Sequence, residues 1–421
     1  MATHVAPSGE AAGTLAEFAD ELRYFARQPI LDLRGRVHGY ELLFRNGPHA
    51  AFSGDGDLAT RTMLDNSVIF GIERLTGGLP AFVNCTRESL VDELVHVLPA
   101  GMTVLELLED LEPTESLIAA CRKLKAAGFR LALDDFSWRP GIEPLLELAD
   151  YVKVDFIQTA PPERKALLER LSRYTMALVA EKVETQEEYE QARAEGFTLI
   201  QGYYFCRPVL LKGQRVPANR LSHIQILRHL RNDPLDLRQL SELVKRDPSL
   251  TYRLLRLVNS PMSALRQEVR SIEAALLAVG DEVFRRIATL AIATEMNTGQ
   301  PPALLRLAFV RGRFCEQAAD LCALDPTEQY LLGLLSLLSA MLLVPMKDLT
   351  PSLPFREEIR RALEGAPVPE AKLLEWLLHH EMADWEGCDA VGSACGLDPR
   401  AAMGRYADAV VWAEDALHFA E

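Results

Sequence analysis

The chain has 421 residues, a formal net charge of −15, 48% hydrophobic residues and 25% charged residues. This length exceeds what one hydrophobic core usually serves, so we expect two domains. The acidic balance argues against general binding to nucleic acid polymers or to anionic membranes, which both favour basic surfaces. An anionic ligand can still bind where metal ions or local basic groups supply the countercharge.

Seven cysteines are scattered along the chain without any C-x-x-C pair. This pattern is typical of a reducing compartment rather than of a disulfide framework or a zinc site. Residues 1–25 lack the basic and apolar segments of a signal peptide. The longest uncharged apolar run, LLGLLSLLSAMLLVPM (331–346), has the length of a buried helix rather than of a membrane span. We therefore expect a cytoplasmic protein that is not bound to a membrane.

Short strand-like runs alternate with amphipathic helical stretches in the first half of the chain. The strand candidates are 24–30, 38–45, 80–85, 102–107, 130–135, 151–155, 177–181 and 198–205. Helical stretches separate most of them, at 58–75, 87–95, 114–127, 162–173 and 185–195. Repeated strand–helix units predict a mostly parallel sheet, and about eight of them indicate a closed (β/α)8 barrel of the TIM type. An open doubly wound sheet is the alternative.

The second half has a helical pattern to its end, with apolar residues at three- and four-residue spacing. Asp, Ser or Pro stands at several of the expected helix starts. We therefore expect an N-terminal tail (1–21), a barrel domain (22–212) and an all-α domain (213–421).

Seven of the predicted strands end in a polar side chain that can coordinate a metal ion or move a proton. These residues are Glu41, Asn84, Glu106, the pair Asp134 and Asp135, Lys153, Glu181 and Gln201. The carboxyl ends of parallel barrel strands meet on one face, where such barrels carry their active sites. One polar strand end is ordinary turn chemistry, but seven predict a functional site.

The predicted site holds five carboxylates and two amides, with neither Cys nor His. These hard oxygen donors favour Mg²⁺ or Mn²⁺ over zinc. Two adjacent aspartates at a strand end can serve two ions, and paired ions support phosphodiester hydrolysis. Because crowded carboxylates repel one another, the set itself argues for bound cations.

Seven sequence runs carry a resemblance to a known family. They are RQPILDLRGRVHGYELLFR (27–45), FVNCT (82–86), LELLED (105–110), LALDDF (131–136), VKVDF (152–156), LVAEKVET (178–185) and IQGYYFCRP (200–208). In this order they resemble an EAL domain, the cyclic-di-GMP phosphodiesterase module, over about residues 22–210.

The resemblance implies a role for each strand-end residue. One metal ion would be held by Glu41, Asn84, Glu106 and Asp134, and a second by Asp134, Asp135 and Gln201. Lys153 and Glu181 would orient or activate the hydrolytic water.

Five further residues receive roles from the same resemblance. Gln28 and Arg45 match residues that grip the dinucleotide, and Arg suits phosphate oxygens or guanine edges. Leu43 keeps the last residue of the family's signature and belongs with this substrate-binding set. Glu184 would support the site from behind, and Glu109 would tether the loop after the fifth strand.

The chain departs from the family's pattern in two places. The signature reads ELL (41–43) rather than Glu-Ala-Leu, a change that need not affect the metal ligands. After Asp135 the chain reads FSWRPG (136–141), where active members carry Phe-Gly-Thr-Gly, and glycine permits unusual loop dihedrals. That loop is linked in the family to metal occupancy and dimerisation.

Residues 219–296 resemble an HDOD domain, a helical relative of the HD phosphohydrolases that lacks their catalytic residues. No His in the chain is followed by Asp, so the metal-binding dipeptide of HD enzymes is missing. The segment HHEMAD (379–384) fails the H-E-x-x-H zinc pattern, because Asp384 replaces the second His. We expect His379 and His380 to end a helix and to favour its dipole. The run VNSP (258–261) predicts a helix stop.

Three functions remain open at this point. The first is hydrolysis of cyclic-di-GMP to the linear dinucleotide with two Mg²⁺ or Mn²⁺ ions, while the helical half regulates the barrel or docks a signalling protein. The second is an effector that binds cyclic-di-GMP or a protein partner without hydrolysis. The third is a scaffold that binds no nucleotide. A homodimer is a further expectation from the resemblance.

Overall fold

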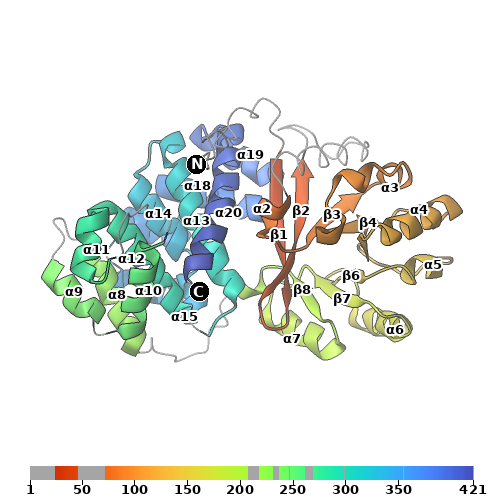
Figure 1. Cartoon of the computed structure of the whole chain (residues 1–421), viewed down its shortest axis with the longest axis horizontal. Helices are drawn as coiled ribbons and strands as arrows, with labels where there is room; N and C mark the ends of the chain where they lie inside the picture. Colours follow the sequence, from red (N-terminus) through yellow and green to blue (C-terminus); the bar gives the residue numbers. More distant parts are fainter. Residues whose placement is uncertain are drawn as a thin grey trace, which may run out of the picture.

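The computed structural model describes residues 24–45, 72–206, 218–230, 237–245, 247–260, 269–297, 299–353 and 355–420. These residues form a closed eight-stranded barrel and a helical half that lies beside it (Figure 1). Within these ranges, no helix combines the length and the apolar character needed to cross a membrane.

The barrel closes in chain order, with the first strand next to the eighth. Its strands are β1 (Tyr24–Asp32), β2 (Val37–Arg45), β3 (Ala81–Cys85), β4 (Thr103–Leu107), β5 (Arg130–Leu133), β6 (Tyr151–Asp155), β7 (Ala177–Glu181) and β8 (Leu199–Gln201). Strands β2 to β8 are parallel, whereas β1 runs antiparallel to both of its neighbours. The predicted barrel is confirmed, and the open sheet is wrong.

Strand β1 is antiparallel because a tight turn joins it to β2, and a short connection cannot link parallel strands. The Asp32 carboxylate accepts the backbone N–H groups of Arg34 at 2.8 Å and Arg36 at 2.9 Å. Gly35 adopts a φ of 72°, and a Cβ there would lie 2.6 Å from the Cβ of Pro301 in the helical half. The turn therefore needs glycine both for its backbone and for its close approach to the helices.

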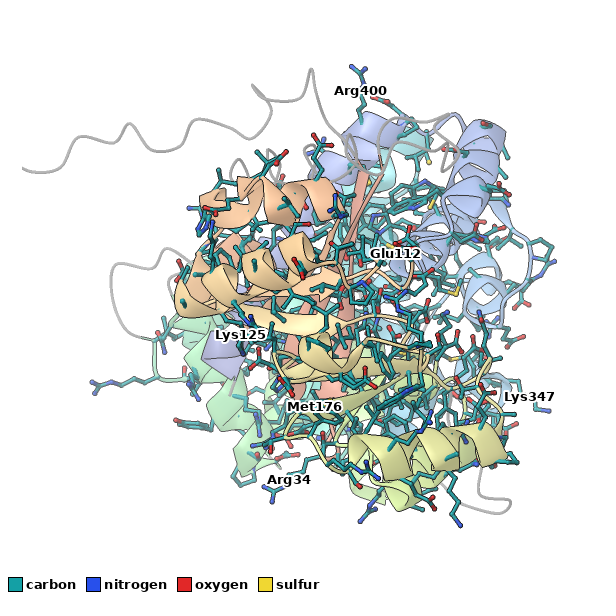
Figure 2. The ribbon with its side chains drawn as sticks, turned by 90° about the vertical axis from the view of Figure 1, so that its right-hand side faces the viewer. Arg34, Glu112, Lys125, Met176, Lys347 and Arg400 are labelled. Atoms are coloured by element: carbon teal, nitrogen blue, oxygen red, sulfur yellow. The ribbon has the colours of Figure 1, made fainter. Side chains whose placement is uncertain are left out.

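Helices on the outside of the barrel connect the parallel strands. They are α2 (Ile72–Thr76), α3 (Arg87–Val91), α4 (Glu115–Ala126), α5 (Glu143–Leu146), α6 (Pro161–Leu171) and α7 (Gln186–Glu195). In Figure 2, Lys125 on α4 and Met176 before β7 lie on the barrel face turned away from the helical half. The helices predicted at 114–127, 162–173 and 185–195 are confirmed. Most of the predicted helix 58–75 lies outside the described residues.

Two predicted elements are shorter in the structure because the backbone turns early. Glu93 has a φ of 59° and separates α3 from a 3₁₀ turn at Leu94–Val97, so the helix predicted at 87–95 is interrupted. Gly202 has a φ of 143° and ends β8, and a 3₁₀ turn at Tyr204–Cys206 replaces the rest of the strand predicted to residue 205. A Cβ on Gly202 would lie 2.0 Å from the backbone oxygen of Val183, so no other residue fits without a shift.

Helix α7 begins with a capping box. The Thr185 hydroxyl accepts the Glu188 N–H at 3.2 Å, and the Glu188 carboxylate accepts the Thr185 N–H at 3.0 Å. We expect Thr185→Ala to lower the free energy of unfolding by about 1 kcal/mol. Thr185→Ser keeps the hydroxyl and should retain most of this stability in urea denaturation. Equal losses in the two variants would contradict the capping role.

The helical half is all-α in the parts that the structure describes, as expected. Its helices are α8 (Ala218–Leu230), α9 (Leu237–Lys245), α10 (Pro248–Val258), α11 (Ile272–Val279), α12 (Asp281–Met296), α13 (Pro302–Ala318), α14 (Pro326–Leu335), α15 (Leu338–Leu342), α16 (Met346–Leu349), α17 (Glu357–Leu363), α18 (Lys372–Glu381), α19 (Trp385–Cys395) and α20 (Pro399–Ala420). The domain boundary expected near residue 213 falls in 207–217, outside the described residues.

Three expectations for this half can be compared with the structure. The apolar run 331–346 is not one helix, because α14 ends at Leu335 and Leu343 has a φ of 56° after α15. The helix stop near 258 is confirmed by the end of α10 at Val258. His379 and His380 lie in the last turn of α18, as expected, but burial lowers the pKa of His380 to about 3, so its imidazole is neutral and carries no charge toward the helix dipole.

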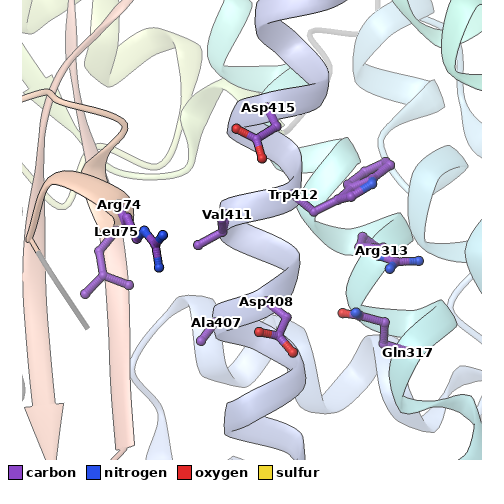
Figure 3. Close-up of a pocket in the computed structure, with 9 residues that line it drawn as sticks. All are labelled: Arg74, Leu75, Arg313, Gln317, Ala407, Asp408, Val411, Trp412 and Asp415. Atoms are coloured by element: carbon purple, nitrogen blue, oxygen red, sulfur yellow. The ribbon is translucent and has the colours of Figure 1, made fainter. Parts of the chain in front are cut away.

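Helices α18 and α20 pack beside the β1–β2 hairpin, on the barrel side that faces the helical half (Figure 1). Arg27 on β1 donates to the backbone oxygen of Leu75 at 2.7 Å and to Glu414 on α20 at 3.2 Å. A cavity of about 270 Å³ is lined by Leu75 of α2 and by Val411 and Trp412 of α20 (Figure 3). The two halves therefore meet along β1, which carries one of the predicted substrate-binding residues.

Candidate active site

The inward-facing residues of the barrel form two layers. The lower layer is an apolar cluster made of Ile30, Phe82, Val104, Ala132, Tyr151, Val179 and Leu199. The upper layer stands two positions later on the parallel strands and consists of Asn84, Glu106, Asp134, Lys153, Glu181 and Gln201. Side chains two apart on a strand share a face, so the apolar layer is the floor of the polar one. On the antiparallel β1 the order reverses, and Gln28 stands two positions before Ile30.

The Lys153 ammonium lies at the centre of the polar layer and is fully buried. Its Nζ contacts one oxygen of each of four carboxylates, from Glu41 in the middle of β2, Glu106 on β4, Asp134 directly after β5 and Glu181 at the end of β7. The distances are 3.0 Å to Glu41, 2.7 Å to Glu106, 2.8 Å to Asp134 and 2.9 Å to Glu181. Residues more than 100 positions apart in the chain therefore converge on one point, as the strand-end pattern predicts.

Two amides complete the ring around Glu41. Gln201 Nε2 donates to Glu41 Oε2 at 2.7 Å and to Gln28 Oε1 at 3.2 Å. Asn84 Nδ2 donates to Glu41 Oε1 at 3.2 Å. We call Lys153, its four carboxylates and these two amides the strand-end cluster.

Asp135 lies beside this cluster rather than in it. Its φ of 38° takes the backbone out of the strand, and its Oδ1 lies 3.7 Å from Lys182 Nζ. Lys182 also forms an ion pair with the buried Asp155. Sequence reasoning did not single out Lys182 and Asp155, although both belong to the motifs EKVET and VKVD that it used.

Burial and like charge set the protonation of the cluster. Burial raises the pKa of Glu106 well above its usual value, and the Glu41 charge adds to the rise. Burial likewise raises the pKa of Asp134, against the opposing effect of Lys153. Burial would raise the pKa of Glu41 too, but Lys153 and the amide hydrogen bonds outweigh it and hold that pKa low. One ammonium among four carboxylates leaves the cluster short of positive charge.

Several buried oxygens of the cluster and of the neighbouring Asp135 have no hydrogen-bond partner. They are Asn84 Oδ1, Glu106 Oε2, Asp135 Oδ1, Glu181 Oε2 and Gln201 Oε1. Buried polar atoms are normally satisfied, so unpaired hard oxygens at one strand-end face fit a divalent cation such as Mg²⁺ or Mn²⁺. As the side chains stand, no three Asp, Glu, His or Cys residues of the described ranges are spaced to hold an ion between them. The carboxylates instead point at Lys153. Their oxygens are the right donors for a divalent ion, but the carboxylate side chains must rotate away from Lys153 before an ion can bind.

The pKa shifts predict how stability depends on pH when no divalent ion is present. Burial raises the pKa of Glu181 to about 8, so the folded protein keeps a proton that the unfolded chain releases near pH 4.5. The histidines of the unfolded chain lose their protons near pH 6.5. Above this pH the folded protein holds more protons than the unfolded chain, so the free energy of unfolding falls as the pH rises toward 8. One such proton contributes a slope of about 1.4 kcal/mol per pH unit. Urea denaturation should show this fall, and Glu181→Gln should flatten it; a rise over the same range would contradict it.

The altered loop after Asp135 is held by its own side chains. Arg139 donates to the backbone oxygens of Glu109 and Leu111. The Arg170 guanidinium lies over the Trp138 ring, 4.6 Å from the centroid of that ring. Glu109 itself is exposed, so its tether to the loop runs through its backbone rather than its carboxylate.

The remaining predicted residues lie around the cluster. Glu184 is exposed at the start of α7, and its N–H donates to Glu188 at 2.7 Å. Leu43 follows Glu41 by two positions on β2 and so faces the same side of the strand. Arg45 ends β2, and its side chain lies outside the described part of the structure.

Each half of the chain matches the model of a known protein family. The family model for the EAL domain matches residues 81–208, and the model for the HDOD domain matches residues 217–352. The uncharacterized protein YuxH of Bacillus subtilis is 33% identical over 92% of this chain and 97% of its own length. The cyclic di-GMP phosphodiesterase CdgJ of Vibrio cholerae is 32% identical over 93% of this chain and 92% of its own length.

Among solved structures, the EAL domain of Mycobacterium smegmatis DcpA matches with a TM-score of 0.36 and 22% identity, over 43% of this chain and 91% of that one. The two consecutive domain matches agree with the barrel and the helical half described above. The chain belongs to the family of proteins that join an EAL domain to an HDOD domain.

Proposed function

We propose that the barrel binds cyclic-di-GMP and hydrolyses one of its phosphodiester bonds to give the linear dinucleotide. The observation that carries this proposal is the convergence of Glu41, Glu106, Asp134 and Glu181 on one buried point. A relative that covers nearly the whole chain, CdgJ, is a cyclic di-GMP phosphodiesterase, which supports the same activity here.

The oxygen donors of the strand-end cluster would hold two Mg²⁺ or Mn²⁺ ions. Glu41, Asn84, Glu106 and Asp134 would bind the first ion, and Asp134, Asp135 and Gln201 the second. When bound, such ions neutralise the phosphate charge and make the attacking water more acidic. The unpaired oxygens of Asn84 and Gln201 support this assignment.

Glu181 is the proposed proton acceptor of the reaction. The Glu181 Oε2 atom is buried and has no hydrogen-bond partner. Burial raises the pKa of Glu181 to about 8, and a general base is most efficient when its pKa lies near the operating pH. Lys153 holds the other oxygen of Glu181 at 2.9 Å and so orients the carboxylate toward the attacking water. Gln28, beside Gln201 at the rim of the cluster, would bind the dinucleotide together with Leu43 and Arg45.

The second candidate is an effector that binds the dinucleotide without hydrolysis. The observation that favours it is the position of Lys153, whose ammonium occupies the point on which four carboxylates converge. If the ammonium kept this position when ligand bound, the carboxylates could not turn toward metal ions, and the barrel would act by binding alone.

Incubation of the purified full chain with cyclic-di-GMP and Mn²⁺ separates these functions. We expect the linear dinucleotide to accumulate, and Glu41→Ala to abolish its formation. Glu187→Ala, which alters an exposed carboxylate in the first turn of α7, is the control and should leave the rate unchanged. Binding without product would support the effector, and neither binding nor product would support a scaffold.

We further propose that the helical half docks a signalling protein or regulates the barrel, and that two chains pair as a homodimer. Its HDOD match and its contact with β1 support a regulatory role. All seven cysteines are free, which supports action in a reducing cytoplasm.

A further inference from the structure

Helix α18 of the helical half ends directly against the barrel beside the strand-end cluster. Its last residue, Glu381, offers a backbone oxygen that accepts Tyr203 Oη–H at 2.5 Å and Gln28 Nε2–H at 3.3 Å. The preceding His380 is neutral, and its Nε2 donates to the backbone oxygen of Phe25 on β1 at 2.8 Å. The contact therefore joins α18 to both β1 and the turn after β8.

The Glu381 carbonyl is available to the barrel because α18 leaves it without a backbone donor. The last carbonyls of a helix lack partners within the helix and lie at its negative end. The turn that follows satisfies the oxygens of Leu378, His379 and His380 with the N–H groups of residues 382–384. Two side-chain donors of the barrel take the remaining oxygen.

The position of Glu381 is fixed from inside the helical half. Its carboxylate forms two hydrogen bonds with Arg311 on α13, at 2.9 Å from Nε and 2.7 Å from Nη2. Both side chains are almost fully buried. Arg311 Nη1 also donates to the Ser336 hydroxyl at the end of α14, at 3.2 Å. Two parallel hydrogen bonds between buried side chains hold Arg311 and Glu381 in one relative orientation.

A chain of hydrogen bonds leads from Glu381 into the strand-end cluster. Gln28 donates its Nε2 to Glu381 and accepts Gln201 Nε2 on its Oε1, at 3.2 Å. The same Gln201 nitrogen donates to Glu41. These partners fix which way the Gln28 amide faces. In the reversed orientation the Gln28 oxygen would face the Glu381 oxygen, and the Gln28 nitrogen would face the Gln201 nitrogen.

We propose that Glu381, Arg311 and Tyr203 are positioning residues for the barrel's site, which hold the Gln28 amide in the orientation that receives the dinucleotide. This inference rests on the proposed function, in which Gln28 contacts the substrate. It assigns the helical half a physical route to the site, and the coupling is reciprocal. A partner that shifts the end of α18 changes the affinity for the dinucleotide, and the dinucleotide changes the affinity for that partner by the same factor.

Two matched pairs of variants test the inference in the full chain. Tyr203→Phe removes one donor to Glu381, and Tyr189→Phe removes an equivalent bond, to the Leu33 backbone oxygen at 2.9 Å, elsewhere in the barrel. Arg311→Lys removes the buried fork to Glu381, and Arg164→Lys removes a fork from the buried Arg164 to the partly exposed Glu195, between α6 and α7. The controls make the same chemical changes away from Glu381 and Gln28.

We expect Arg311→Lys and Tyr203→Phe to raise the KM for cyclic-di-GMP about five- to tenfold, an effect of the size usual for coupled sites. The kcat should change by less than about twofold, since Gln28 binds substrate and does not act in the proton-transfer step. The two controls should leave both constants unchanged. Equal effects in the test and control variants would mean that Arg311 and Tyr203 act only on stability.

A second measurement does not depend on any ligand. Hydrogen exchange of the Gln28 side-chain amide, identified by the signal lost in Gln28→Glu, should be slow in the native chain and faster in Arg311→Lys. Arg164→Lys should leave it slow. An unchanged exchange rate in Arg311→Lys would overturn the inference. If exchange responds but the native chain neither binds nor cleaves cyclic-di-GMP, the positioning contact stands and the proposed function fails.

Discussion

Lys153→Met is expected to lower the free energy of unfolding by about 3–5 kcal/mol at neutral pH in the absence of divalent ions, since a buried ion pair that loses one partner leaves an uncompensated charge. Lys153 is fully buried and is the one cation in contact with Glu41, Glu106, Asp134 and Glu181 among the described residues. Urea denaturation of the metal-free protein measures this loss. Added Mn²⁺ should restore part of it, because the ions replace the missing positive charge.

The control for this variant is Lys123→Met. Lys123 pairs with Glu93 at 2.9 Å, but both side chains are largely exposed. Exposed pairs of this kind contribute little to stability, so the control should have nearly native stability. A Lys153→Met protein as stable as this control would show that the buried carboxylates carry protons and do not need the ammonium.

Glu181→Gln is expected to lower the kcat for cyclic-di-GMP hydrolysis by about 10²–10⁴-fold with little change in KM, the range usual for loss of a general base. The amide keeps the size of the side chain and one oxygen for Lys153, but it cannot accept the proton of the attacking water. Initial rates of linear dinucleotide formation under saturating Mn²⁺ measure the effect.

Two comparisons make this result specific to Glu181. Glu187→Gln changes an exposed carboxylate at the start of α7 and should have the native kcat. The substrate dissociation constant of Glu181→Gln should stay close to the native value, because the residue is not part of the proposed dinucleotide surface. A native kcat in Glu181→Gln would remove Glu181 from the proton-transfer step.

The barrel and its site could be predicted because each parallel strand carries its own signal. A short apolar run that ends in a carboxylate or amide identifies both the strand and the face on which the side chain lies, as with Glu106 and Glu181. The period of two then places Lys153 and Asp134 in the same layer without knowledge of the contacts. The convergence of these residues follows from closure of the barrel alone.

The contacts of the helical half with the site could not be predicted in this way. The segment that contains His380 and Glu381 was compared only with a zinc-binding sequence pattern. In the structure His380 donates to the backbone oxygen of Phe25, and the backbone oxygen of Glu381 accepts the side chain of Gln28. Such contacts join residues more than 350 positions apart, and nothing in the local pattern identifies the partner. The antiparallel direction of β1 was missed, although the short gap between the predicted strands 24–30 and 38–45 leaves no room for the crossover that parallel strands need.

The central claim is that the strand-end cluster binds divalent ions although Lys153 lies at its centre. Equilibrium dialysis of the purified chain against Mn²⁺, with bound metal counted per chain, tests it most directly. We predict two bound Mn²⁺ ions in the native chain and a clear loss of both in Asp134→Asn, since Asp134 is the residue assigned to both ions. No bound Mn²⁺ at millimolar concentration, or the same count in Asp134→Asn as in the native chain, would contradict it.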